Sequence, residues 1–369
     1  MARGWRSSLG LVLTGLALAG CGGTAPAASA PPSAAPASVA AASKPAAASA
    51  SASAKPAASA SAAASAASSG QLIVSYGNVS GDSVPLWVAA DEGIFKKNGL
   101  DVKPLLVKGG TESMAALLSN NAQLSEGGGA EAAGATANGA DIVVTMIGSP
   151  VYPYKLYVPA DIKTGADLKG KKIDVTNFAS SVDVATRVGL KKLGISVNDV
   201  TLVTMGTHTV GTAALLSGNI QARMDNMPGA VELEAKGYHG LVDLAAEKLP
   251  AANTGVNVQR AWLNTHHDVA QKFIDSMIEA TVLVKKDKAG TIAVMKKEFK
   301  SDDTEAMTKT YDFFAPEVFP TQPFPKPEQF ADIKEYLTDK QPKIKDVDLS
   351  RLLDPSFVQS AVDRGVDKQ

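Results

Sequence analysis

Residues 71–107 read QLIVSYGNVSGDSVPLWVAADEGIFKKNGLDVKPLLV. The apolar start of this stretch, residues 71–76, predicts a strand that leads into a polar loop. Pro85 suits the first turn of a helix, and apolar residues then recur at helical spacing up to Gly99, where the helix is expected to end. Residues 100–107 predict a second strand. A strand, a helix and a strand in this order indicate a parallel sheet covered by helices.

The same alternation continues to about residue 263. Further strands are expected at residues 123–125, 141–147, 154–158, 172–175, 199–205, 220–226 and 255–263. Beyond residue 267 the pattern predicts only helices, at residues 268–286, 291–299, 303–314, 327–338 and 355–364. The fold class is therefore α/β, and ligands of such sheets bind beyond the carboxyl ends of the strands.

Charge is distributed unevenly along the chain. Residues 1–70 contain no Asp or Glu and only four of the 36 bases, so residues 71–369 hold all 37 acids against 32 bases. This acidic remainder argues against a nucleic-acid-binding protein. Cys21 is the only cysteine, which excludes an intramolecular disulfide and a cysteine-based zinc site.

The first 20 residues have the pattern of a secretory signal peptide. A short basic start is followed by an apolar run at residues 9–18, which is too short to cross a bilayer as a helix. The run ends Leu18-Ala19-Gly20-Cys21, which resembles the lipobox of bacterial lipoproteins, where a peptidase cuts before the cysteine and its thiol is acylated. We expect residues 1–20 to be removed and Cys21 to be lipidated. An ordinary signal peptide with an incidental cysteine is the alternative.

Residues 21–70 consist almost entirely of Ala, Ser and Pro after Cys21 and its glycines. The frequent Ser and Pro break the helix that Ala alone would favour, and the segment has no apolar face to bury. We expect a disordered tether that holds the folded part of the chain at a membrane surface.

Five stretches of the chain resemble one family. They are residues 85–102 (PLWVAADEGIFKKNGLDV), 138–141 (NGAD), 167–173 (DLKGKKI), 213–220 (AALLSGNI) and 354–358 (DPSFV). In this order they resemble the nitrate/sulfonate/taurine and NMT1/THI5-like (SsuA-like) group of periplasmic binding proteins, which are solute receptors of ABC importers. The chain departs from the family pattern at Gln221-Ala222, where Asp-Ala is usual, and its next acid is Asp225.

The resemblance implies a type II periplasmic binding protein fold, with two α/β lobes joined by a two-stranded hinge and the ligand cleft between them. Lobe 1 is expected at residues 71–157 plus 260–369 and lobe 2 at residues 158–259, with the hinge near residues 157–161 and 256–260. It also implies a monomeric, extracytoplasmic lipoprotein that captures a small solute by lobe closure and delivers it to an ABC permease in the membrane. No cofactor, metal or catalytic residue is expected.

Polar loops that follow the strands supply the candidate ligand-binding residues. They are Asn78, Ser80, Gly109, Gly110, Thr111, Gly128, Gly129, Asn177, Ala179, Ser180, Ser181, Gly206, Thr207, Asp225 and Asn226. Most of them lie where helices begin, and the free N–H groups there favour an anionic or zwitterionic solute. Nitrate, sulfonates, taurine, aromatic acids and pyrimidines all remain open as ligands.

Other patterns point to different chemistry. Asp82 and Glu126 could bind an amine or a cationic ring, although such acids are often solvated or cap a helix. Residues 127–132 (GGGAEA) fit the dinucleotide fingerprint, but the preceding strand is short and polar and the next acid after the helix comes too early to contact a ribose. His266 and His267 are adjacent, so they point in different directions and do not favour a zinc site.

Two other function classes stay open. One is a membrane-tethered sensor or binding module that passes its signal to another protein. The other is an enzyme on the same scaffold, since eukaryotic members of the wider family are thiamine-pyrimidine synthases. Those members carry a cysteine-rich motif that this chain lacks, and the chain also lacks a Gly-x-Ser-x-Gly elbow.

Overall fold

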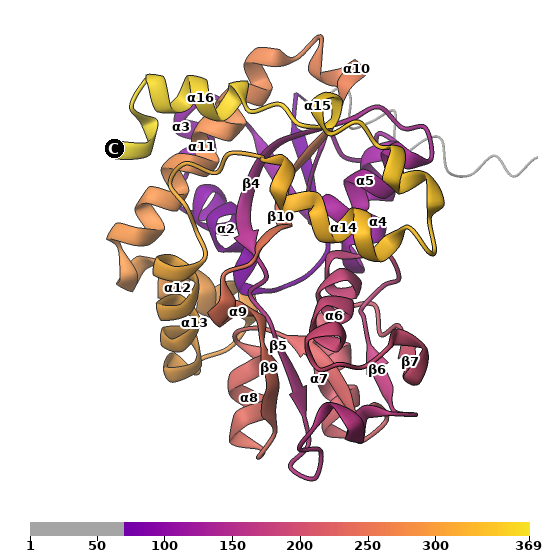
Figure 1. Ribbon diagram of the computed structural model, residues 1–369. Coiled ribbons are helices and arrows are strands. Elements are labelled where there is room, and N and C mark those ends of the chain that lie inside the picture. Colours follow the sequence, from indigo (N-terminus) through magenta and orange to yellow (C-terminus); the bar gives the residue numbers. More distant parts are fainter. Residues whose placement is uncertain (1–69) are drawn as a thin grey trace, which may run out of the picture. The chain divides into compact units, whose positions relative to one another are not determined.

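The computed structural model describes residues 70–369 (Figure 1). The expected signal peptide, the lipidation site Cys21 and the tether up to residue 69 lie outside the described residues. Residues 70–369 contain two five-stranded sheets. We call the first sheet with its helices lobe 1 and the second sheet with its helices lobe 2. Within these residues, no helix is both long enough and apolar enough to cross a membrane.

Lobe 1 contains the sheet with the strand order β2-β1-β3-β10-β4. Its strands are β1 (Leu72–Tyr76), β2 (Val102–Leu106), β3 (Leu124–Gly127), β4 (Ile142–Val151) and β10 (Pro250–Gln259). β1 pairs in parallel with β2 and β3, as the alternation of strands and helices predicts. β10 runs antiparallel to β3 and β4, because the chain returns to this sheet from lobe 2.

Lobe 2 contains the sheet with the strand order β7-β6-β8-β5-β9. Its strands are β5 (Lys155–Val158), β6 (Lys172–Asp174), β7 (Thr201–Val203), β8 (Ala222–Asp225) and β9 (His239–Asp243). β6 pairs in parallel with β7 and β8, whereas β5 runs antiparallel to β8 and β9. The two sheets therefore share one design, with a parallel part and one antiparallel strand that enters from the other lobe.

The chain crosses between the lobes twice, at adjacent places. Residues 152–154 connect β4 to β5, and the return passes through α9 (Leu244–Glu247) before β10 begins. Val151 and Pro250 are register partners, so the two crossings leave the first sheet side by side.

Both crossings lie earlier in the chain than the expected hinge segments at residues 157–161 and 256–260. β5 is paired within lobe 2 on both of its edges, and β10 is paired with β4 over its length in lobe 1. β10 overlaps the strand expected at residues 255–263 but begins and ends earlier, because residues 250–254 (PAANT) are small and polar and form no apolar run.

Helices cover both faces of the lobe 1 sheet. They include α2 (Val84–Asp91), α3 (Ile94–Lys97), α4 (Gly109–Leu118), α5 (Gly129–Ala137), α10 (Arg260–Leu263), α11 (His267–Lys286), α12 (Lys288–Phe299), α13 (Thr304–Glu317), α15 (Leu349–Leu352) and α16 (Ser356–Asp363). The single helix expected up to Gly99 is divided into α2 and α3, because Gly93 takes a left-handed conformation with φ of 71°. The rings of Phe95 and Phe273 stack 5.2 Å apart and join α3 to α11 in the buried core.

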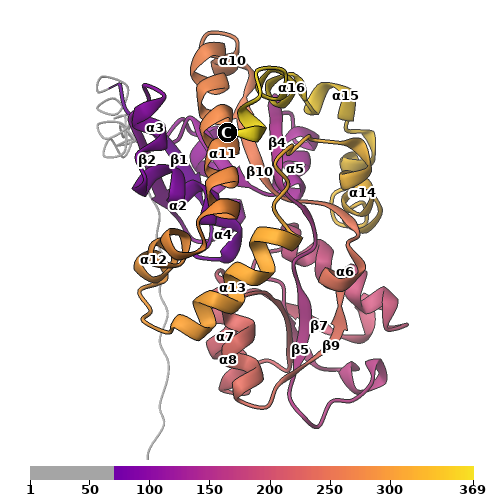
Figure 2. The same ribbon diagram turned by 90° about the vertical axis from the view of Figure 1, so that its left-hand side faces the viewer.

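The helices of lobe 2 are α6 (Ser181–Lys192), α7 (His208–Leu216) and α8 (Gly229–Ala235). Ser180 and Thr207 cap α6 and α7, because each side chain accepts a backbone N–H of the first turn. One further helix, α14 (Ala331–Leu337), packs against both α6 and α5 (Figure 2). It lies in the C-terminal part of the chain, which the sequence analysis assigned to lobe 1.

Candidate ligand-binding site

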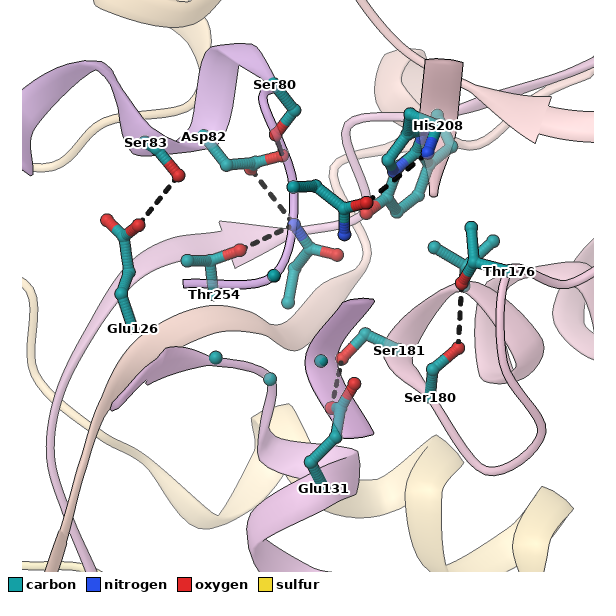
Figure 3. A pocket seen from close by; sticks show the side chains of 18 residues that line it. Ser80, Asp82, Ser83, Glu126, Glu131, Thr176, Ser180, Ser181, His208 and Thr254 are labelled. Atoms are coloured by element: carbon teal, nitrogen blue, oxygen red, sulfur yellow. Dashed lines mark hydrogen bonds between the residues drawn. The ribbon is translucent and has the colours of Figure 1, made fainter. Parts of the chain in front are cut away.

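A cavity of about 60 Å³ lies between the carboxyl ends of the strands of the two lobes (Figure 3). Its lining comes from both lobes and from the crossing segments. The lining residues are Gly77, Asn78, Ser80, Asp82, Ser83, Gly110, Glu126, Gly127, Gly128, Glu131, Tyr154, Thr176, Ser180, Ser181, Val182, His208, Asn253 and Thr254. Polar side chains dominate this set, so the cavity is built to make hydrogen bonds.

Asp82 lies in the short turn after β1 and contacts three neighbours. Its carboxylate accepts hydrogen bonds from Ser80 Oγ at 3.2 Å, from Asn226 Nδ2 at 3.0 Å and from Asn253 Nδ2 at 3.0 Å. Asn226 follows β8 in lobe 2, so this carboxylate joins the two lobes. Burial raises the pKa of Asp82, although these hydrogen bonds act in the opposite direction.

Glu126 projects from β3, and Ser83 Oγ donates to its Oε2 at 2.7 Å. Burial raises the pKa of Glu126 to about 8, against the effect of the Ser83 hydrogen bond, and the neighbouring charge of Asp82 adds to the rise. The side chain is therefore a carboxyl group that keeps its proton more readily than an exposed glutamate does.

Glu131 lies in the first turn of α5 and faces the first residue of α6. Ser181 Oγ lies 3.4 Å from Glu131 Oε2, which makes a second contact between the lobes (Figure 3). Burial raises the pKa of Glu131 to about 7. A side chain at Gly128 would collide with this pair, because a Cβ there would lie 2.0 Å from Ser181 Oγ.

His208 begins α7 and forms much of the lobe 2 wall. Its ring stacks on Tyr154 with centroids 6.0 Å apart, and its backbone N–H donates to Asn78 Oδ1 of lobe 1 at 3.3 Å. Its Nδ1 lies 3.2 Å from Asp225 Oδ1 and 3.0 Å from Arg223 Nη2. The ring is thereby held in place from behind.

Arg223 is completely buried behind this wall rather than in the cavity. Its guanidinium forms ion pairs with Asp225 at 3.2 Å and Asp174 at 3.5 Å and donates to the His208 carbonyl at 2.7 Å. Burial opposes ionisation of Asp225, but the charge of Arg223 prevails and lowers the pKa of that carboxyl. The charge of the guanidinium is thus paired with these two carboxylates. No Lys or Arg is among the residues that line the cavity.

The loop before α6 is held in an uncommon conformation. Thr176 and Ala179 both have positive φ, of 56° and 60°, which costs on the order of 1 kcal/mol or more per residue. Asp174 Oδ1 fixes the loop by accepting the backbone N–H of Thr176 at 2.8 Å and that of Met205 at 3.0 Å. This places Ser180 and Ser181 at the cavity wall.

The structure places the sequence-predicted site residues in three groups. The residues that line the small cavity are Asn78, Ser80, Gly110, Gly128, Ser180 and Ser181. Asp225 and Asn226 line a neighbouring, wider cavity of about 590 Å³, which shares Ser80 and His208 with the first as lining residues. The others do not line the small cavity; they are Gly109, Thr111, Gly129, Asn177, Ala179, Gly206 and Thr207.

Gly109 nevertheless lies where the lobes meet. Its φ is 85°, and a Cβ at this position would lie 2.1 Å from Asn177 Nδ2 and 2.7 Å from the Gly206 carbonyl oxygen of lobe 2. Only a glycine allows the two backbones to approach this closely.

The NMT1/THI5-like family model matches residues 80–287. The chain belongs to the NMT1/THI5-like family. Curated proteins of Brucella that are named only provisionally as binding proteins match over 159 residues at 28% identity, among them one from Brucella abortus strain 2308. That match covers 40% of this chain and 48% of the relative, so the chain spans about half the length of the curated relatives it matches.

Solved structures show the fold of this NMT1/THI5-like protein. The alkanesulfonate-binding protein SsuA from Xanthomonas axonopodis pv. citri, bound to MOPS, is 20% identical with a TM-score of 0.66, over 78% of this chain and 98% of that one. The periplasmic aliphatic sulphonate binding protein SsuA from Escherichia coli is 20% identical with a TM-score of 0.63, over 77% and 97%. The desulfurization enzyme DSZB is 16% identical with a TM-score of 0.57, over 80% and 99%. The expected periplasmic-binding-protein fold is confirmed.

Several lining residues of this family member were not among the predicted site residues. They are Asp82, Ser83, Glu126, Glu131, Tyr154, Thr176, His208, Asn253 and Thr254, with Gly77, Gly127 and Val182. Asp82 and Glu126 were considered only as an alternative, and Asn253 lies in the part of β10 that precedes the strand expected at residues 255–263. A lone acid within the small-residue run at 127–134 was the one signal that could have indicated Glu131.

The remaining histidine pattern is structural. The ring of His266 stacks on Trp262 at 4.5 Å, whereas His267 packs against Phe357 at 4.6 Å. Within residues 70–369, no group of three or more His, Cys, Asp or Glu side chains is arranged to hold a metal ion.

Proposed function

We propose that this protein is the extracytoplasmic solute-binding component of an ABC importer. The observation that carries the proposal is a polar cavity whose walls come from two lobes joined by two adjacent crossings. A solute that contacts both walls stabilises the closed arrangement, because only contacts made with both lobes depend on closure. The SsuA proteins that share the fold are named for sulfonate binding, which supports a binding role.

The same proposal includes a membrane anchor and delivery to a permease. The sequence Leu18-Ala19-Gly20-Cys21 supports acylation of the cysteine after removal of the signal peptide. The Ala/Ser/Pro-rich residues 22–70 would then let the lobes reach a permease while the acyl chains stay in the membrane. We propose that the protein works as a monomer.

The cavity lining bears on the class of solute. An anionic or zwitterionic solute was expected from the helix N-termini alone. Three buried carboxyl groups line the cavity and no Lys or Arg does, so the lining offers a purely anionic solute no positive side chain to pair with. We therefore propose a solute that carries a positive group, either a zwitterion or a cation.

An enzyme on this scaffold is the second candidate, because the desulfurization enzyme DSZB shares the fold. The one histidine of the cavity lining, His208, is held in place by Asp225, Arg223 and Tyr154. We propose binding without turnover. Recovery of a chemically altered solute after prolonged incubation would favour the enzyme.

The test uses the full chain with Cys21→Ser, which keeps it free of acyl groups. A thermal-shift screen identifies a solute, and small-angle scattering and calorimetry then measure compaction and stoichiometry. We expect one solute per chain and a smaller radius of gyration on binding. Ser181→Leu, which fills the cavity, should abolish both effects, whereas Ser119→Leu at the exposed end of α4 should preserve them. An unchanged scattering curve with a bound solute would contradict the proposal.

A further inference from the structure

The cavity contains three carboxyl side chains that the proposed importer role alone does not explain. They are Asp82 from the turn after β1, Glu126 from β3 and Glu131 from α5, and we call them the carboxylate cluster. They are 7%, 6% and 9% exposed, and all three line the same small cavity. Three elements of lobe 1 therefore supply acidic groups to the lining of one cavity.

None of these three carboxylates has an ion-pair partner within residues 70–369, where the ion pairs involve other acids. Their hydrogen-bond donors are neutral hydroxyl and amide groups, from Ser83, Ser181 and the amides that hold Asp82. A buried carboxylate without a cation is costly, so each of these groups either keeps a proton or pairs with a cation that enters the cavity. Arg223 does not supply the positive charge, because the guanidinium contacts Asp174 and Asp225 behind the cavity wall.

Asn253 gives an independent indication of what the cavity accepts. Its side chain is 3% exposed and lines the cavity, and its Nδ2 donates to Asp82. Its Oδ1 is buried and has no hydrogen-bond partner among the described residues. A carbonyl oxygen can only accept, so the group that completes this site must be a donor.

We propose that the carboxylate cluster and Asn253 Oδ1 recognise a positively charged nitrogen group of the solute, an ammonium, amidinium or guanidinium. The inference rests on the proposed solute-binding function and names the chemical class that this site takes. Such groups carry several N–H donors and a positive charge, which match a cavity lined by several carboxyl groups and an amide oxygen that accepts. Charge-assisted hydrogen bonds of this kind are stronger than those between neutral groups.

The size of the two cavities divides the solute into a head and a body. The small cavity of about 60 Å³ has room for a charged head group of a few heavy atoms. The cavity of about 590 Å³ shares Ser80 and His208 with it as lining residues, and apolar side chains such as Val79, Leu216 and Met227 line part of the larger cavity. The uncharged remainder of the solute would extend there.

Proton competition follows from this arrangement. Other titratable or charged groups near the cluster are Tyr154 and His208 at the cavity, with Arg223, Asp174 and Asp225 behind His208. Burial raises the pKa of Tyr154, which therefore stays neutral. A cation must displace protons from the cluster, so its affinity should rise with pH by up to about tenfold per unit for each proton displaced. An anion would show the opposite trend.

The test compares probes of similar shape and opposite charge on the full Cys21→Ser chain. Benzylammonium and benzamidinium are the cationic probes, and benzoate and benzenesulfonate are the anionic ones. The thermal-shift screen also includes three panels of equal size, of small organic cations, neutral molecules and anions. We expect hits among the cations. Calorimetry should then show that Glu126→Gln and Glu131→Gln each weaken cation binding by about tenfold to a hundredfold. Glu305→Gln, whose side chain is 77% exposed, is the matched control and should change nothing.

The outcomes separate the two proposals. Anionic or neutral hits that compact the protein and tolerate both Gln variants would overturn the cation inference and leave the binding function intact. Cationic hits that bind with unchanged affinity in both variants would also overturn it. No hit in any panel, with no molecule retained in native mass spectrometry, would count against both. The Gln variants preserve side-chain shape, and circular dichroism at each pH verifies that they are folded.

Discussion

Glu126→Gln should change the way the stability of the unliganded protein depends on pH. Burial raises the pKa of Glu126 from 4.5 to about 8. Between these two values the folded protein holds a proton on this carboxyl group that the unfolded chain has already lost. Because the folded state binds more protons, its free energy of unfolding falls as the pH rises through this interval.

The expected magnitude follows from the width of the interval. The rise from 4.5 to about 8 spans about 3.5 pH units, which at about 1.36 kcal/mol per unit corresponds to about 5 kcal/mol. The loss begins near pH 4.5 and is complete only above about pH 8. Glutamine stays uncharged, and its amide oxygen can still accept the Ser83 hydroxyl. The variant should therefore match the wild type in acid and exceed its stability above pH 8 by up to about 5 kcal/mol.

Urea unfolding of both proteins at a series of pH values, followed by circular dichroism, measures this difference. Glu305→Gln, with an exposed side chain, is the control and should follow the wild type throughout. A difference between Glu126→Gln and the wild type that stays constant from about pH 5 to about pH 9 would refute the reasoning, since it would show that Glu126 titrates alike in the folded and unfolded states.

Three further predictions concern closure, buried charge and anchoring. Gly109→Ala should weaken solute binding by about tenfold, because the added Cβ would press into lobe 2. Gly139→Ala is the control, since Gly139 has a φ of 97° and open space around it, and its affinity should stay unchanged. Equal affinities of Gly109→Ala and the wild type in calorimetry would contradict this. Arg223→Met should lower the free energy of unfolding by about 3–5 kcal/mol in urea titrations, because two buried carboxylates would lose their cation, and a negligible change would be the opposing result. Cys21→Ser should move the protein from the membrane fraction to the soluble one, and a variant still found with membranes would argue against acylation.

The sequence allowed much of the fold to be predicted, because alternating strands and helices and the matching family stretches depend on local residues. The parallel pairing around β1 and β6 agrees with that expectation. The positions of the crossings did not agree. β10 is a long strand of small and polar residues that is stabilised by two neighbouring strands, and no local pattern encodes that support.

The candidate site was predictable only in part. Loop residues such as Ser80 and Ser181 could be located, because glycines, serines and helix starts mark the carboxyl ends of strands. The same signals could not predict which charged side chains line the cavity and which are paired behind it. Whether Glu131 is buried depends on contacts with Ser181 from the other lobe, and one of the two acids that neutralise Arg223, Asp174, comes from the neighbouring strand β6. Such effects arise only when distant parts of the chain meet.

The packing of α14 on α6 gives the molecule a preferred side for opening. Besides the two covalent crossings, Lys191–Glu335 and Arg187–Asp339 contacts fasten the lobes along this edge. Residues of α13, α7 and α8 line the wider cavity. These three helices lie on the side away from α14 (Figure 2). We therefore expect the lobes to rotate apart about the α14–α6 contact. The gap would then open beside α13, where a solute should enter and leave.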